Sequence, residues 1–240
     1  MYNFDHIVNW KLLQGSHDFP GPDGGTCINE AAIIAAGFEY KKVLSHNDCP
    51  PCFSSVLSQY AIGVNDLLPD NERQQLMKFV LRLSGSADTT EVEQKRAKYI
   101  AEMTIRKILP LALRHVGLNK EADRCEAEGT KESALAATDS IAALYAASAA
   151  SAALDTLAAD AADAASYAAN AASAALDARA TDVAIRTKDI LNPSDISKMY
   201  KYLIEILEGA FAIGNQSTLA DVCKVNERLE TAKQLVKENS

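Results

Sequence analysis

The chain lacks the features of a secreted, membrane-spanning or nucleic-acid-binding protein. It has only five Cys in 240 residues, at irregular spacing, which argues against a disulfide scaffold. The N-terminal residues show no basic stretch followed by an apolar one, so they predict no signal peptide. No uncharged run is long and apolar enough to span a bilayer. The 24 basic residues are fewer than the 32 acidic ones, which argues against direct nucleic-acid binding. We therefore expect a cytoplasmic protein.

Strand signals are also nearly absent, because no run of alternating β-branched and aromatic residues occurs. Four of the seven Pro lie between residues 15 and 53 together with several Gly, and this density predicts irregular backbone. Residues 130–192 contain neither Gly nor Pro. The fold class that we predict is all-α. A helical domain would cover residues 1–120, and residues 121–240 would form an Ala-rich helix packed against two C-terminal helices.

Apolar spacing and capping signals predict the individual helices. Thr26 is expected to cap the second helix and Gly37 to end it in a left-handed conformation. Pro110 should kink a helix, and Asn192 followed by Pro193 should start one. The predicted ranges are 3–13, 27–36, 54–68, 71–83, 90–115, 193–214 and 217–237.

The most unusual segment is rich in alanine, which makes up 26 of the 51 residues between Ala134 and Ala184. Ala has the highest helix propensity. When residues are placed at ~100° intervals around an axis, the polar ones keep largely to one side over about nine turns. Large apolar residues gather on another side, among them Leu154, Leu157 and Leu176. This phase favours one long helix over a low-complexity tether, and its Ala-lined face would need a close neighbour.

Charge along this segment is of one sign. Residues 133–178 contain five Asp and neither Lys nor Arg. The simpler interpretation is a solvated acidic stripe that keeps the helix soluble. The alternative is an anionic surface that binds a basic partner, with Asp155, Asp160 and Asp163 at its centre.

Candidate chemistry lies in the Gly- and Pro-rich region near the N-terminus. Cys27 falls in the first turn of a predicted helix, where the helix dipole should lower its pKa and favour the thiolate. A catalytic thiolate also needs a base, which His17 or His46 could supply. A buried core Cys is the common alternative.

A second set of residues has metal-ligand spacing. His46, Cys49 and Cys52 are each three residues apart, and Cys27 could complete a Cys₃His zinc site. Cys49 and Cys52 could instead be a redox pair, although the βαβ context of thioredoxin-like proteins is missing. A structural loop whose Cys side chains pack in the core is the remaining interpretation.

The segments GGTCINEAA and CPPCFSSVLSQYAIGVNDLLPDNERQQL resemble a family of uncharacterised bacterial and phage-borne proteins. Its members are similar in pairing a Gly-Gly-x-Cys-x-x-Glu-Ala stretch with a Cys-Pro turn and an Ala-rich C-terminal helical region. The resemblance implies no activity. It points to Gly24, Gly25, Cys27, Glu30 and Cys52 as the positions that matter.

These observations lead to one leading functional hypothesis and two alternatives. The leading one is a non-enzymatic interaction module whose Ala-rich helical surface binds another protein or a second copy of the chain. The first alternative is a zinc- or thiol-dependent enzyme centred on Cys27, His46, Cys49 and Cys52. The second, based on the net charge of -8 and the phage-like resemblance, is an acidic inhibitor of a nucleic-acid-binding machine.

Overall fold

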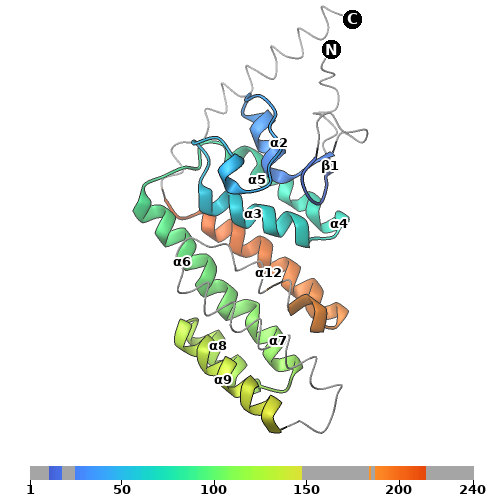
Figure 1. Ribbon diagram of the computed structural model, residues 1–240, viewed down its shortest axis with the longest axis vertical. Helices are drawn as coiled ribbons and strands as arrows, with labels where there is room; N and C mark the ends of the chain where they lie inside the picture. The colour runs from blue at the N-terminus through green and yellow to red at the C-terminus, as the bar shows by residue number, and fades with distance from the viewer. Residues whose placement is uncertain (1–10, 18–24, 148–183, 185–186, 215–240) are drawn as a thin grey trace, which may run out of the picture. The chain divides into compact units, whose positions relative to one another are not determined.

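The computed structural model describes residues 11–17, 25–147, 184 and 187–214. Over these residues the chain is mostly helical, which confirms the predicted all-α class (Figure 1). The chain divides into two compact units, residues 1–93 with 214–240 and residues 94–213. The division at residue 120 that the sequence suggests stays a prediction about domain organisation.

The first unit consists of short helices around an apolar core. Its elements are α2 (Ile28–Ala35), η1 (His46–Asp48), α3 (Ser55–Leu67), α4 (Asp70–Arg73), η2 (Gln74–Leu76), α5 (Met77–Leu83) and the start of α6 (Thr90–Lys107). Helix α2 packs against α3 and α5, and η1 packs against α3 (Figure 1). The largest fully buried side chains of this unit are Leu12, Ile28, Ile33, Leu57, Tyr60, Leu68, Leu76, Phe79 and Leu83.

The predicted helix over residues 3–13 is wrong at its C-terminal end. Lys11–Leu12 form strand β1, which pairs in parallel with β2 (Gly25–Thr26), and residues 3–10 lie outside the described ones. The register places Leu12 opposite Thr26, and Leu13 N donates to Thr26 O over 3.0 Å. The helical spacing of apolar residues was overridden here by these long-range backbone contacts, which local sequence does not encode.

The start of α2 also differs from the prediction. Thr26 belongs to β2, and Cys27 is the residue that caps the helix. Cys27 Sγ accepts from Glu30 N, and Cys27 N donates to Glu30 Oε2 over 2.9 Å, so the two residues form a capping box. The predicted end of this helix is confirmed. Gly37 has a φ of +78°, and its N–H donates to Ile34 O over 2.8 Å.

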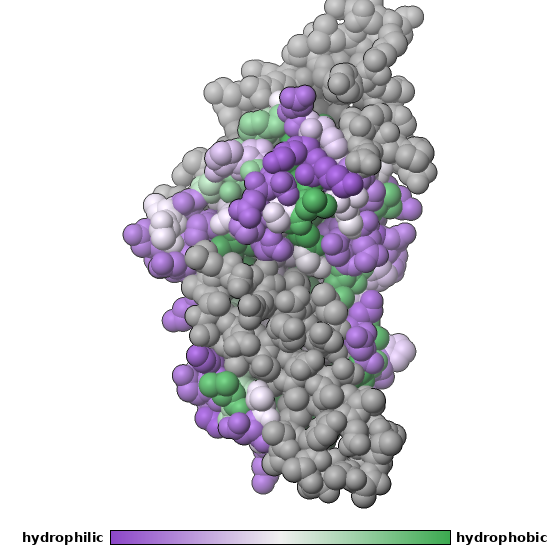
Figure 2. Space-filling view, in the orientation of Figure 1, coloured by the Kyte–Doolittle hydropathy of each residue, from purple (hydrophilic) through white to green (hydrophobic). Residues whose placement is uncertain are grey.

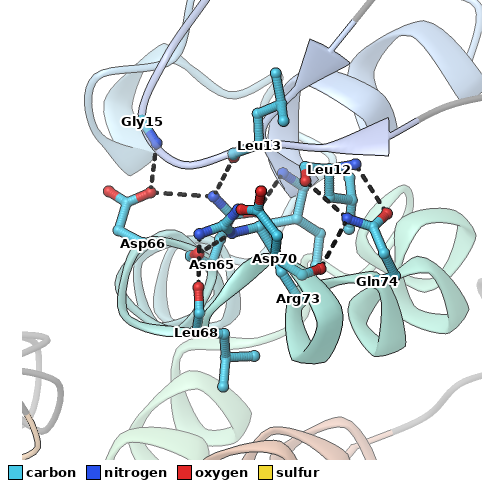
Figure 3. A network of polar contacts seen from close by, with 10 residues as sticks. Leu12, Leu13, Gly15, Asn65, Asp66, Leu68, Asp70, Arg73 and Gln74 are labelled. Carbon is cyan, nitrogen blue, oxygen red and sulfur yellow. Dashed lines mark hydrogen bonds and ion pairs between the residues drawn. The ribbon is translucent and has the colours of Figure 1, made fainter.

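The predicted helix over residues 71–83 is interrupted. This stretch consists of α4, the 3₁₀ turn η2 and α5. The neighbouring predicted helix over residues 54–68 is confirmed by α3, whose N-cap is Ser54. Arg73 lies at the end of α4, where this interruption begins, and its side chain is buried beside the end of α3. Its Nε donates to Asn65 O over 2.7 Å, and its Nη2 donates to Leu68 O over 2.5 Å (Figure 3). A buried guanidinium thus satisfies carbonyls at the end of α3.

The second unit begins within α6, at residue 94. It continues with α7 (Leu109–His115), α8 (Asn119–Glu128), α9 (Lys131–Ala147) and α12 (Pro193–Phe211). The unit contains α9, α12 and most of α6, which are the longest helices among the described residues. Helix α8 packs against both α7 and α9. The predicted kink is confirmed as a break at Ile108, two residues before Pro110, which lacks the N–H that a continuous helix would need. The predicted start of α12 is also confirmed, since Asn192 Oδ1 accepts from Asp195 N over 3.0 Å.

Helices α6 and α12 run antiparallel within this unit (Figure 1). Arg96 Nε donates to Ile213 O over 3.0 Å, and eleven residues later Lys107 Nζ lies 2.7 Å from Glu205 Oε2. Between these two contacts, Gly209 faces Tyr99 so closely that a Cβ at residue 209 would lie 1.9 Å from the Tyr99 hydroxyl oxygen. Glycine therefore permits the close approach of the two helices.

Helix α9 covers the first part of the predicted Ala-rich helix. Ala134 and Ala137 are fully buried, whereas Leu135 is exposed. The rest of the predicted surface lies outside the described residues, and this includes Leu154, Asp155, Leu157, Asp160, Asp163 and Leu176. The predicted helix over residues 217–237 lies outside them as well.

Candidate functional site

The site begins with a buried carboxylate on the first turn of α2. Glu30 has no solvent exposure. Besides the N–H of Cys27, its carboxylate accepts from His17 N over 3.1 Å and from Val43 N over 3.2 Å. His17 Nδ1 lies 3.4 Å from Glu30 Oε2. A buried carboxylate is stable only when hydrogen bonds compensate for its lost hydration, and here those bonds come from three separate chain segments.

The thiol of Cys27 is not the activated nucleophile that the sequence suggested. The residue is 3% exposed. Burial raises the pKa of Cys27, and the nearby Glu30 carboxylate raises it further, whereas the backbone hydrogen bonds at the start of α2 lower it by less. The prediction of a lowered pKa is therefore wrong, because the helix terminus acts inside an apolar environment next to an anion. The structure supports a capping role for this thiol.

Glu30 also fixes the base of a surface segment, residues 38–48, which is named the binding loop for the function that is proposed for it below. Within the binding loop, Val43 is buried and its N–H donates to Glu30. The Asp48 carboxylate accepts from Leu44 N and Ser45 N, each over 3.0 Å. These backbone bonds, and more weakly Lys41 at 3.3 Å, hold the pKa of Asp48 below its usual value of 3.8. The backbone on both sides of Leu44 is therefore held in one conformation.

The binding loop presents two large apolar side chains to solvent. Leu44 is 73% exposed and Phe38 is 45% exposed. The face of the described residues in Figure 2 is largely hydrophilic, with hydrophobic residues in small patches. A single exposed Leu is ordinary on a protein surface. The unusual feature here is that the backbone beneath Leu44 is fixed by a buried carboxylate and by a partly buried one, and such fixed anchors lose little conformational entropy on binding.

An open hollow of about 370 Å³ adjoins the end of the binding loop. Its lining comes entirely from the first unit, namely from η1, the following Pro-Pro turn, the start of α3, residues 87–88 before α6 and the first turn of α6. The lining residues are His46, Asn47, Cys49, Pro50, Pro51, Phe53, Ser54, Ser55, Ala87, Asp88 and Glu93. The volume falls in the range of small-ligand sites, ~300–1,000 Å³.

Hydrogen bonds fix the polar groups of the hollow. His46 Nδ1 lies 2.9 Å from Gln59 Oε1, and His46 N donates to the same oxygen over 3.3 Å. Since an amide oxygen is an acceptor, His46 Nδ1 is the donor in this contact. Glu93 Oε2 accepts from Ser54 Oγ over 2.6 Å and from Val56 N over 3.3 Å. Glu93 thus supplies the anion that the N-terminus of α3 favours.

The four residues of the predicted zinc site do not form one cluster. His46 and Cys49 both line the hollow, Cys52 is half-buried nearby in sequence, and Cys27 is buried at the start of α2. Among the described residues, no three His, Cys, Asp or Glu side chains form a group that could hold a metal ion. Burial raises the pKa of Cys49 to about 11, an effect that the Ser58 hydroxyl only partly offsets. The thiol is therefore protonated at neutral pH.

Sequence reasoning missed several residues of this site. Leu44 and Asp48 were not singled out, because nothing in the local sequence shows that Val43 is buried while the adjacent Leu44 is exposed. Asp88 and Glu93 carry no local signal, because only the folded first unit brings them beside His46.

No protein-family model, curated protein or solved structure matches this chain. The resemblance to bacterial and phage-borne proteins therefore stays a prediction. Across the part of the chain that the structure describes, no helix has the length and apolar character needed to cross a membrane.

Proposed function

We propose that the chain is a non-enzymatic protein-interaction module whose first unit binds another protein, or a second copy of the chain, through the binding loop. The observation that supports this proposal is Leu44, a largely exposed leucine on backbone that Asp48 and Glu30 hold in place. Burying a leucine side chain in a partner gains roughly 1.5–3 kcal/mol relative to leaving it in water. Interfaces concentrate their energy in such anchors when the anchors are well ordered beforehand.

The Ala-rich helical surface stays part of the proposal as a second contact area. Its central residues, Leu154, Asp155, Leu157, Asp160, Asp163 and Leu176, lie outside the described residues, so the argument here depends on the binding loop.

Site-specific photo-cross-linking in cells that express the full chain tests this function. A photoreactive amino acid replaces Phe38 in the binding loop or, as the control, Asn71, an exposed polar residue of α4. We expect discrete cross-linked adducts from residue 38 and none of the same mass from residue 71. An adduct with a second copy of the chain supports the proposal equally.

A second change ties these adducts to the apolar anchor. Leu44→Asp should abolish the residue-38 adducts, because a carboxylate cannot enter an apolar pocket without a partner. Leu44→Met keeps the volume and apolarity and should preserve them. Adducts that survive Leu44→Asp, or identical adducts from residues 38 and 71, would overturn the proposal.

A further inference from the structure

The contact between α2 and α3 contains two fully buried side-chain oxygen atoms. Asn29 Oδ1, in the first turn of α2, and Ser58 Oγ, in α3, belong to residues with no solvent exposure. In the part of the chain that the structure describes, neither atom has a hydrogen-bond partner. An unpaired polar atom in a protein core costs free energy, so such atoms are rare and usually indicate a bound molecule that satisfies them.

The two oxygens lie at the same point of this helix contact. Asn29 Nδ2 donates to Ser58 O over 2.9 Å, and this hydrogen bond holds the Asn29 amide against Ser58. Oδ1 is bonded to the same carbon atom as Nδ2, and Oγ belongs to the residue whose carbonyl accepts the bond. The two unpaired oxygens are therefore neighbours across the contact between α2 and α3.

The chemistry of the pair selects a small neutral donor. Oδ1 is only an acceptor, whereas the Ser58 hydroxyl can both donate and accept. A metal cation does not suit the pair, because two neutral oxygens cannot compensate for a buried charge. Complete burial limits the ligand to the size of a water molecule. We propose that one structural water molecule is bound between α2 and α3, where it donates to Asn29 Oδ1 and forms a second hydrogen bond with Ser58 Oγ.

Cys49 separates this water site from the hollow. The Ser58 hydroxyl lies beside the Cys49 thiol, whose pKa it lowers against the larger effect of burial. A thiol is a weak hydrogen-bond partner and cannot satisfy the hydroxyl as an oxygen does. Because Cys49 also lines the hollow, the water lies one side chain away from solvent. It can therefore exchange with solvent without unfolding of α2.

Oxygen-17 magnetic relaxation dispersion of the solvent tests the site, because it counts buried waters that exchange with bulk water. The measurement compares the full chain with Ser58→Ala, which removes one of the two partners of the water and retains a good helix former. We expect the dispersion amplitude to fall by the contribution of one water molecule and the urea midpoint to decrease. Ser55→Ala, the same change at a half-buried residue in the first turn of α3, is the matched control and should leave the amplitude unchanged.

Asn29→Leu tests the other partner of the water. Leucine has a similar volume but no acceptor, so this variant should lose the same single water, and the double variant with Ser58→Ala should lose no more. An amplitude that is equal in the wild type and Ser58→Ala, or a double variant that loses two waters, would overturn the inference. A urea midpoint that rises in Ser58→Ala relative to Ser55→Ala would also overturn it, because deleting a hydroxyl without any partner stabilises a protein core.

Discussion

The side-chain amide of Gln74 pairs with both backbone polar groups of Leu12. Leu12 N donates to Gln74 Oε1 over 3.1 Å, and Gln74 Nε2 donates to Leu12 O over 2.9 Å (Figure 3). Strand β2 lies against β1, so Gln74 gives Leu12 the pair of bonds that a further strand would make. Because Leu12 is fully buried, water cannot replace these bonds, and a side chain from η2 holds the first strand in place.

Gln74→Leu should therefore destabilise the chain. The change leaves a buried N–H and a buried C=O without this partner, which costs about 1–3 kcal/mol of unfolding free energy in urea titrations. Gln75→Leu is the matched control, because Gln75 is exposed, and it should change the unfolding free energy by less than about 0.5 kcal/mol. Equal losses in the two variants would show that the Gln74 amide does not support β1.

How far the sequence predicts this fold depends on how local the determining contacts are. The Asn192 cap, the Gly37 stop and the Pro110 break are set by neighbouring residues, and all three were predicted. Strand β1 depends on Thr26 and on Gln74, 62 residues further along the chain, so its local sequence gave no sign of it.

Glu30→Gln should loosen the binding loop. The glutamine amide has one acceptor oxygen, whereas the carboxylate has two. The NH₂ group that replaces the other oxygen cannot accept a hydrogen bond, so either the N–H of Cys27 or the N–H groups of His17 and Val43 lose their acceptor. Each hydrogen bond to a charged group contributes about 1.5–3 kcal/mol. Hydrogen–deuterium exchange at the Val43 amide should accelerate beyond the change in global stability.

Cys27→Ala is the comparison for this variant. It removes the thiol that caps α2 and leaves the contact between Glu30 and Val43 in place. Exchange at Val43 should then follow global stability alone, and the same acceleration in both variants would contradict the role given to Glu30.

The buried thiol of Cys27 should make the chain less stable in alkali. Its pKa is raised in the folded state above the ordinary value of 9.0, so above about pH 9 the unfolded chain loses this proton while the folded chain keeps it. Stability then falls by about 1.4 kcal/mol per pH unit for this one group. The difference in unfolding free energy between the wild type and Cys27→Ser, measured at about pH 8 and about pH 10.5, isolates this effect from other titrating groups. A difference that does not change with pH would contradict it.

The candidate site was only partly predictable for a related physical reason. His46, Cys49 and Cys52 stand out by their spacing, but spacing does not report burial, and burial raises the pKa of both Cys49 and Cys27. The sequence pointed to Glu30 through a family resemblance and as a weak candidate ligand for a divalent cation, and neither signal indicates a structural role. Its role as a shared acceptor for His17 and Val43 depends on contacts 13 residues apart in each direction.

Gly209→Ala should separate α6 from α12. The new methyl group would lie 1.9 Å from the Tyr99 hydroxyl oxygen and 2.5 Å from Tyr99 Cζ, so the ring or the helices must move. Such overpacking costs about 1–3 kcal/mol, which exceeds the gain of up to about 1 kcal/mol that Ala brings to a helix interior. Tyr99→Ala removes the obstacle, so Gly209→Ala should be neutral or stabilising in that background when urea unfolding is measured over the full double-mutant cycle. If Gly209→Ala costs the same with and without the Tyr99 ring, the close approach of α6 and α12 is not what requires glycine at residue 209.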